Sequence, residues 1–252
     1  MTSSPAAPMI LVHGAWHGSW CWQEVGEHLE RERVDVAVVT LPGHDDPGSH
    51  RRNWARMSAY IDTVSDAAKS FDRPAVLVGH SMGGYVVQRF LETNTAAAGV
   101  LVASVPRRGA LGANLRLLKD HPLLTAKATV MADYSGLVGS TDLVGSLFFR
   151  PETPAEIVES TYSQLQNESA LAISTMIVRP PRPKRVTTPV HVVAASDDAI
   201  FTLEEQRDLA VAYGTELQIV ANSGHDIMLD TNWETLAQIL VDVATSGGRP
   251  TE

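Results

Sequence analysis

The sequence predicts an α/β protein with an open, mostly parallel central sheet flanked by helices. Two observations predict this class. Short, continuously apolar runs recur along the chain with longer segments of helical character between them, as expected for strands buried on both faces of a parallel sheet. The length of 252 residues fits one large domain, or one core with an inserted subdomain.

Six runs are the expected strands, and each is short and rich in apolar or β-branched residues. In chain order they are 9–12, 34–40, 75–78, 99–103, 190–194 and 216–221. Helical segments are expected around the third strand, at 54–70 and 83–94. Thr202 and Thr231 each stand three residues before a glutamate, and this capping-box spacing predicts that a helix begins at each.

Between the fourth and fifth expected strands the sequence has no strand-like apolar run, and helix-compatible segments are separated there by Gly and Pro. Helices are expected at 154–165 and 168–178, and the three prolines in 179–184 predict a linker back to the sheet. We interpret this region as a helical cap inserted into the core. The expected division is 1–105 for the first part of the core, 106–188 for the cap and 189–252 for the second part of the core.

The composition narrows the choice of partners and compartment. A net charge of −9 argues against nucleic acid or an anionic membrane surface as the main partner. The single cysteine, Cys21, can form neither an internal disulfide nor a cysteine-based zinc site. The longest wholly apolar run, 96–103, is too short to span a bilayer, and 1–8 lacks the features of a secretory signal. We therefore expect a cytoplasmic protein that is not bound to a membrane.

The third expected strand leads into Gly79-His80-Ser81-Met82-Gly83-Gly84 and then into a helix. Gly79-x-Ser81-x-Gly83 is the nucleophile-elbow pattern, in which a serine occupies a sharp turn between a strand and a helix. Glycines are needed because side chains at those positions would collide with the strand and the helix. Backbone N–H groups at the helix start can face a developing oxyanion beside the serine. The pattern predicts Ser81 as a nucleophile.

These residues, read as GHSMGG, resemble the α/β-hydrolase superfamily. Two further segments support the resemblance. His13-Gly14-Ala15-Trp16 is similar to the superfamily's oxyanion loop, and Leu41-Pro42-Gly43-His44 is similar to its usual turn after the second strand. The resemblance extends from Met9 to about Val243 and implies the α/β-hydrolase fold, with the predicted cap at the position of the family's variable cap.

The resemblance also implies a charge relay in the chain order serine, acid, histidine. His225 follows the last expected strand, where the family's catalytic histidine lies, and Asp198 follows the fifth strand, where the family's acid lies. The adjacent Asp197 remains an alternative acid. Aligning Ile200 and Phe201 with the apolar pair of the family's acid segment favours Asp198.

The family's oxyanion hole uses one backbone N–H after the nucleophile and one from the loop after the first strand. By resemblance these belong to Met82 and Ala15. We expect substrate contacts from Trp16 in that loop and from three cap side chains. The three are Leu124, Phe149 and Tyr162.

Neither a cofactor nor a metal is expected. His13 and His17 are four residues apart, as metal-binding histidines on a helix can be, but Gly14 and Gly18 indicate a loop, and the chain has no HExxH pattern. His80 lies inside the elbow, and for it and the remaining histidines other than His225 a structural role is favoured.

Within the superfamily, residues 13–22 most resemble the small plant methylesterase and hydroxynitrile lyase group and its bacterial esterase relatives. In the lyases a threonine replaces the loop glycine and a lysine follows the histidine, whereas this chain has Gly14 and Asp226. The resemblance therefore implies a serine esterase that hydrolyses a small, largely apolar or aromatic carboxylic ester through an acyl-enzyme. A thioester, lactone or C–C substrate, a non-hydrolytic enzyme of secondary metabolism and a ligand-binding receptor stay open, as does a homodimer.

Overall fold

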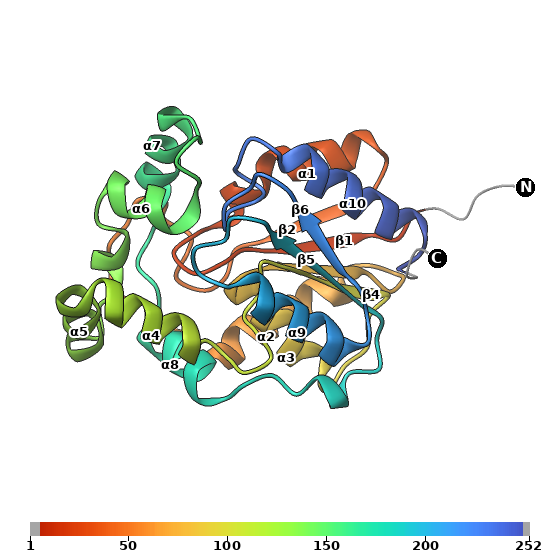
Figure 1. Ribbon diagram of the computed structural model, residues 1–252. Helices are drawn as coiled ribbons and strands as arrows, with labels where there is room; N and C mark the ends of the chain where they lie inside the picture. The colour runs from red at the N-terminus through yellow and green to blue at the C-terminus, as the bar shows by residue number, and fades with distance from the viewer. Residues whose placement is uncertain (1–5, 249–252) are drawn as a thin grey trace, which may run out of the picture.

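The structure, a computed structural model, describes residues 6–248 and has a parallel six-stranded sheet at its centre (Figure 1). The strands are β1 (Met9–Val12), β2 (Val36–Val39), β3 (Val76–His80), β4 (Ala98–Val102), β5 (Val190–Ala195) and β6 (Leu217–Val220). Their order across the sheet is β2-β1-β3-β4-β5-β6, and each adjacent pair is parallel. The predicted fold class is confirmed, and each strand lies within two residues of its expected bounds.

Helices cover both faces of the sheet (Figure 1). One face carries α1 (Gln23–Arg31) and α10 (Trp233–Thr245), and the other carries α2 (Met57–Lys69), α3 (Met82–Leu91) and α9 (Leu203–Tyr213). Alternate strand residues feed the two apolar layers, since successive side chains of a strand point to opposite faces. In β1, for example, Met9 and Leu11 belong to the core under α1 and α10, whereas Ile10 and Val12 belong to the other core.

Five helices occupy the chain between β4 and β5 and gather beside one end of the sheet (Figure 1). They are α4 (Leu111–Asp120), α5 (Pro122–Met131), α6 (Thr141–Phe148), α7 (Ala155–Gln164) and α8 (Ala170–Val178). Short 3-10 turns lie at η1 (Ser19–Trp22), η2 (Ser135–Val138) and η3 (Pro183–Arg185). Within residues 6–248 no helix combines the length and the apolar character that crossing a bilayer requires.

One of the two predicted capping boxes is present. Thr202 Oγ1 accepts from the Glu205 N–H (3.2 Å), and a Glu205 carboxylate oxygen accepts from the Thr202 N–H (2.9 Å). The box predicted at Thr231 is wrong, because α10 begins two residues later at Trp233. The buried Asp230 accepts the Thr231 N–H (2.8 Å) and holds the chain there in a turn.

The helix expected at 168–178 begins only at Ala170. The Ser169 hydroxyl accepts from the Ala172 N–H (3.3 Å) and thereby caps α8. Glu168 lies before this cap, outside the helix, and its side chain is buried. The expected start was wrong because an apolar periodicity does not show which polar residue at its edge serves as the cap.

The turn after β3 packs directly against the end of β1. A methyl group on Gly83, in the first turn of α3, would overlap the carbonyl oxygens of Val12 and His13. Only a residue without a side chain allows this approach. The contact brings the loop that follows β1 alongside Ser81.

We expect Gly83→Ala to lower the free energy of unfolding by about 3 kcal/mol, because the added methyl group meets backbone atoms that cannot rotate away. Gly145→Ala is the matched control: this glycine is inside α6, and its added methyl group would lie 3.6 Å from Val158 Cγ1, an ordinary contact. The control should be more stable than the wild type by roughly 0.5–1 kcal/mol. Urea unfolding measures the free energy of unfolding of both variants. Similar values for the two would contradict the expected overlap.

Candidate active site

Ser81 occupies the turn between β3 and α3, with φ of 51° and ψ of −114°. This region of backbone conformation is sparsely populated by residues other than glycine and is found at functional turns. Two hydrogen bonds hold the turn: the Ser81 N–H donates to Val102 O (3.0 Å), and Ser81 O accepts from the Tyr85 N–H (3.2 Å). The neighbouring strand and the helix therefore impose the strained conformation.

The structure brings His225 and Asp198 together across 27 positions of sequence. His225 Nδ1 lies 2.9 Å from Asp198 Oδ2, and both side chains are only 2% exposed. Asp198 Oδ1 accepts the backbone N–H groups of Ile200 (2.8 Å) and Phe201 (2.9 Å), so the carboxylate is aimed at the ring. Asp197 has a half-exposed side chain that accepts from Ser196 Oγ (2.5 Å) instead.

Burial alone would lower the pKa of His225, but the charge of Asp198 and its hydrogen bond, with a further contribution from Asp226, raise it above its ordinary value. In the neutral ring the proton on Nδ1 is donated to Asp198, which leaves Nε2 as the proton acceptor. The Phe201 ring packs edge-on against the ring of His225, with the centroids 5.5 Å apart. Phe201 lines the same cavity as Ser81, and the ring of His80, which precedes Ser81, lies 4.8 Å from the ring of His225.

The cavity at Ser81 has a volume of about 70 Å³ and a mostly apolar wall. Its lining combines the loop after β1, the elbow and the helices between β4 and β5. The lining residues are Ala15, Trp16, Ser81, Met82, Val105, Ala110, Ala113, Asn114, Leu117, Tyr134, Leu137, Ile173, Met176, Ile177, Ile200 and Phe201. Trp16 is therefore one of the lining residues, and its Nε1 donates to Tyr134 O (3.2 Å).

Ala15 and Met82 both line this cavity, and among the described residues neither backbone N–H has a hydrogen-bond partner. Met82 is the first residue of α3, where helix geometry leaves N–H groups unpaired and the helix dipole favours negative charge. Both amides can therefore donate to an oxygen that becomes anionic beside Ser81.

Three of the four predicted substrate contacts lie elsewhere in the described chain. Leu124 packs into the core from α5, the Tyr162 hydroxyl donates to Gly139 O (3.3 Å), and buried Phe149 abuts Gly224. None of them is among the residues that line the cavity, and their contact with a substrate stays a prediction. The sequence showed that the helices are amphipathic, but an apolar side chain that packs inside a cap and one that lines a pocket give the same pattern.

A second group of buried polar residues surrounds His225, and the sequence reasoning missed it. His17 Nε2 lies 2.8 Å from Asp226 Oδ2, and His80 Nε2 lies 3.0 Å from His225 O. Burial would raise the pKa of Asp226, but His17 and the other nearby histidines lower it. Atoms of His80, His225 and Asp226 lie within 4.8 Å of one another, as metal ligands can, but Asp198 and His17 already engage two of these groups.

Comparisons with known proteins agree with this fold. The alpha/beta hydrolase family profile matches residues 9–239. The esterase PIR7B of Oryza sativa subsp. japonica is 25% identical over 97% of this chain and 98% of its own. The structure of a thermophilic esterase from Thermogutta terrifontis superposes with a TM-score of 0.74 at 19% identity, over 98% of this chain and 92% of its own. The structure of polyneuridine aldehyde esterase superposes with a TM-score of 0.71 at 15% identity, over 94% of this chain and 99% of its own.

The two adjacent aspartates allow a direct test of the contact with His225. Asp198→Asn should lower kcat for an activated ester by roughly 10⁴-fold, because an amide at this position favours the wrong tautomer of the histidine. Asp197→Asn is isosteric and one residue away, and it should stay within a few-fold of the wild type. Steady-state kinetics on one nitrophenyl ester compares the two variants, and a larger loss in Asp197→Asn would reverse the assignment.

Proposed function

The chain belongs to the alpha/beta hydrolase family, and from this premise we propose that it is a carboxylic ester hydrolase with Ser81 as the nucleophile. The observation that carries the proposal is the buried His225–Asp198 hydrogen bond beside the strained serine turn. The free N–H groups of Ala15 and Met82 on the same cavity also support it. The esterases with similar sequence and fold agree with this reaction class.

In the proposed reaction Ser81 Oγ attacks the carbonyl carbon of the ester while His225 Nε2 takes the hydroxyl proton. The carbonyl π electrons move onto oxygen, and the N–H groups of Ala15 and Met82 stabilise the oxyanion. When the intermediate collapses, the bond to the alcohol oxygen breaks and the alcohol leaves with the proton from His225. Water then attacks the acyl-enzyme with His225 again as base, the acid leaves, and Ser81 recovers its proton.

The cavity supports a small, apolar acyl group. Its volume of about 70 Å³ is well below the roughly 300–1,000 Å³ of pockets that hold drug-sized ligands. Leu137, Ile173 and Met176 contribute apolar walls, and Asn114 adds an amide that can bind one polar substituent. A short aliphatic chain or one small ring fits this description better than a long fatty acyl chain.

Removal of the nucleophile tests the proposal. Ser81→Ala should lower the turnover of nitrophenyl acetate by several powers of ten, because only binding and oxyanion stabilisation remain. A fluorophosphonate should label the wild type on the peptide that contains Ser81 and leave the variant unlabelled. Full activity in Ser81→Ala would refute the proposal, and a folded wild type that binds esters without turnover would indicate a receptor.

Acyl-chain selection tests the role of the cavity wall. Met176→Ala should raise kcat/KM for nitrophenyl octanoate relative to butanoate by about 10-fold or more, because each added methylene then finds apolar space. Leu124→Ala is the control, since Leu124 packs among the same group of helices but does not line the cavity. It should keep the wild-type preference for short chains. The same chain-length profile in both variants would mean that this wall does not select the acyl group.

A further inference from the structure

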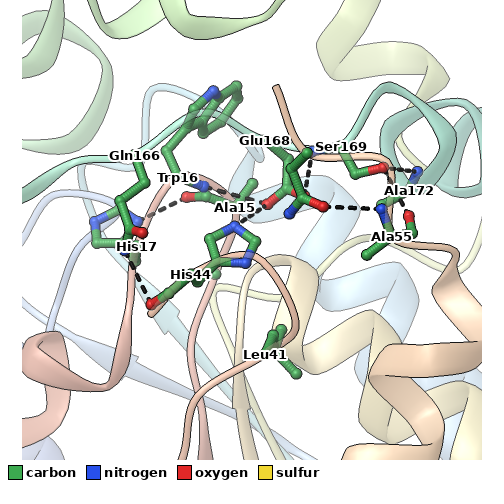
Figure 2. A network of polar contacts seen from close by, with 12 residues as sticks. Ala15, Trp16, His17, Leu41, His44, Ala55, Gln166, Glu168, Ser169 and Ala172 are labelled. Carbon is green, nitrogen blue, oxygen red and sulfur yellow. Dashed lines mark hydrogen bonds and ion pairs between the residues drawn. The ribbon is translucent and has the colours of Figure 1, made fainter. Parts of the chain in front are cut away.

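Glu168 is a buried carboxylate placed between the loop after β1 and the helices beside the sheet (Figure 2). Its Oε2 accepts from the Trp16 N–H (3.3 Å) and from His44 Nε2 (3.0 Å). Its Oε1 accepts from the Tyr60 hydroxyl (2.8 Å) and from the Ser169 N–H (2.6 Å). The four donors come from four separate parts of the chain, and the carboxylate joins them.

Burying a carboxylate without hydrogen-bond partners would cost several kcal/mol of folding free energy. The four donors therefore stabilise the buried carboxylate and also connect four segments of the chain. Burial would lower the pKa of His44, but Glu168 raises it above its ordinary value, so the ring keeps the proton that it donates. Burial and the same charge raise the pKa of Tyr60, which therefore stays a donor. Asn53 Nδ2 donates to the Tyr60 oxygen (3.1 Å) and orients that hydroxyl toward Glu168.

The Ala15–Trp16 peptide is held on both of its edges. Its N–H donates to Glu168, and its carbonyl, Ala15 O, accepts from His17 Nδ1 (2.7 Å). The other ring nitrogen of His17 contacts Asp226. Trp16 has φ of 64°, a left-handed conformation that a tryptophan rarely adopts, so contacts from outside the loop must stabilise it. The Gln166 N–H, on the same segment as Glu168, donates to Trp16 O (2.7 Å).

These contacts fix the direction of the Ala15 N–H. That N–H belongs to the preceding peptide, whose carbonyl, Gly14 O, accepts from His13 Nδ1 (2.9 Å). Ala15 therefore lies between two peptides that are both held by buried side chains. An oxyanion donor works only when its N–H points at the oxygen, and an error of about 1 Å can cost about 10²-fold in rate.

We propose that Glu168 is a positioning residue: by holding the Trp16 N–H it keeps the Ala15 N–H aimed at the substrate oxyanion. This inference rests on the proposed ester hydrolysis, because it assigns Glu168 to the same site. Glu168 does not line the cavity, so its effect passes through the loop and not through the substrate.

The decisive variant is Glu168→Gln, which keeps the side-chain volume but replaces one acceptor oxygen by a donor. Because the Trp16 and Ser169 N–H groups face opposite oxygens, the amide cannot accept from both. We expect its oxygen to stay at the shorter contact, with the adjacent Ser169 N–H (2.6 Å against 3.3 Å), so the Trp16 N–H loses its acceptor. We expect kcat for a nitrophenyl ester to fall about 10- to 100-fold with KM within about twofold of the wild type, since only the transition state uses the oxyanion hole. The affinity for a trifluoromethyl ketone, whose adduct with Ser81 carries an oxyanion, should fall by a similar factor. The affinity for the corresponding unreactive amide should not change.

Ser169→Ala is the matched control on the neighbouring residue. It removes the cap of α8 and the hydrogen bond to Ala55 O (2.7 Å), but it leaves every contact of the Trp16 peptide. Its Tm should fall by roughly 2–4 °C, as for the loss of one helix cap, while kcat and the ketone affinity stay within about twofold of the wild type.

The outcomes separate the two proposals. A wild type that neither turns over esters nor reacts with a fluorophosphonate at Ser81 would refute the proposed function. An active wild type combined with an unchanged kcat and ketone affinity in Glu168→Gln would refute the positioning role, as would an equal loss in Ser169→Ala. If Glu168→Gln does not fold, His44→Phe replaces it, because this variant keeps a ring and removes one donor to Oε2. His44→Phe should lower both kcat and the ketone affinity, and KM should stay unchanged.

Discussion

The close approach of α3 to the end of β1 is the constraint on which the site depends. Because Gly83 has no side chain, the first turn of the helix lies directly on the carbonyls of Val12 and His13. The same turn forces Ser81 into a strained conformation and leaves the Met82 N–H unpaired beside it. Ser81, the Met82 N–H and the loop that carries Ala15 therefore meet because of one backbone contact.

Buried imidazole–carboxylate pairs lie near this contact. His225 pairs with Asp198, His17 with Asp226, and His44 with Glu168. Such pairs gain little net stability, because the cost of removing two charges from water offsets their attraction. Their contribution here is geometric, since each fixes the direction of a ring or of a peptide next to the cavity, and the proposed reaction depends on those directions. A layer of apolar contacts of the same volume could not aim an N–H group.

The features that could be predicted are those that depend on residues close together in the sequence. The strand runs, the glycines around Ser81 and the capping box at Thr202 are all local, and all three are present. The register of the acid segment also placed Asp198, and not Asp197, beside His225. Glu168 was missed because its four donors are 1 to 152 positions away, and nothing beside it marks a buried carboxylate. Leu124, Phe149 and Tyr162 do not line the cavity at Ser81. Sequence periodicity shows which face of a helix is apolar, but it does not show whether that face packs on other helices or lines a pocket.

The contacts of Gln166 and Glu168 also have a consequence for protein engineering. Caps of related enzymes are attractive modules to exchange, on the view that the core supplies the chemistry and the insert supplies the choice of substrate. In this chain the segment that enters α8 carries the acceptor for the Trp16 N–H and the donor to its carbonyl. A chimera that replaces the helices between β4 and β5 would therefore remove the contacts that hold Trp16. A transplant with working chemistry therefore has to retain residues 166–168 as part of the recipient, with the junctions placed on either side of them.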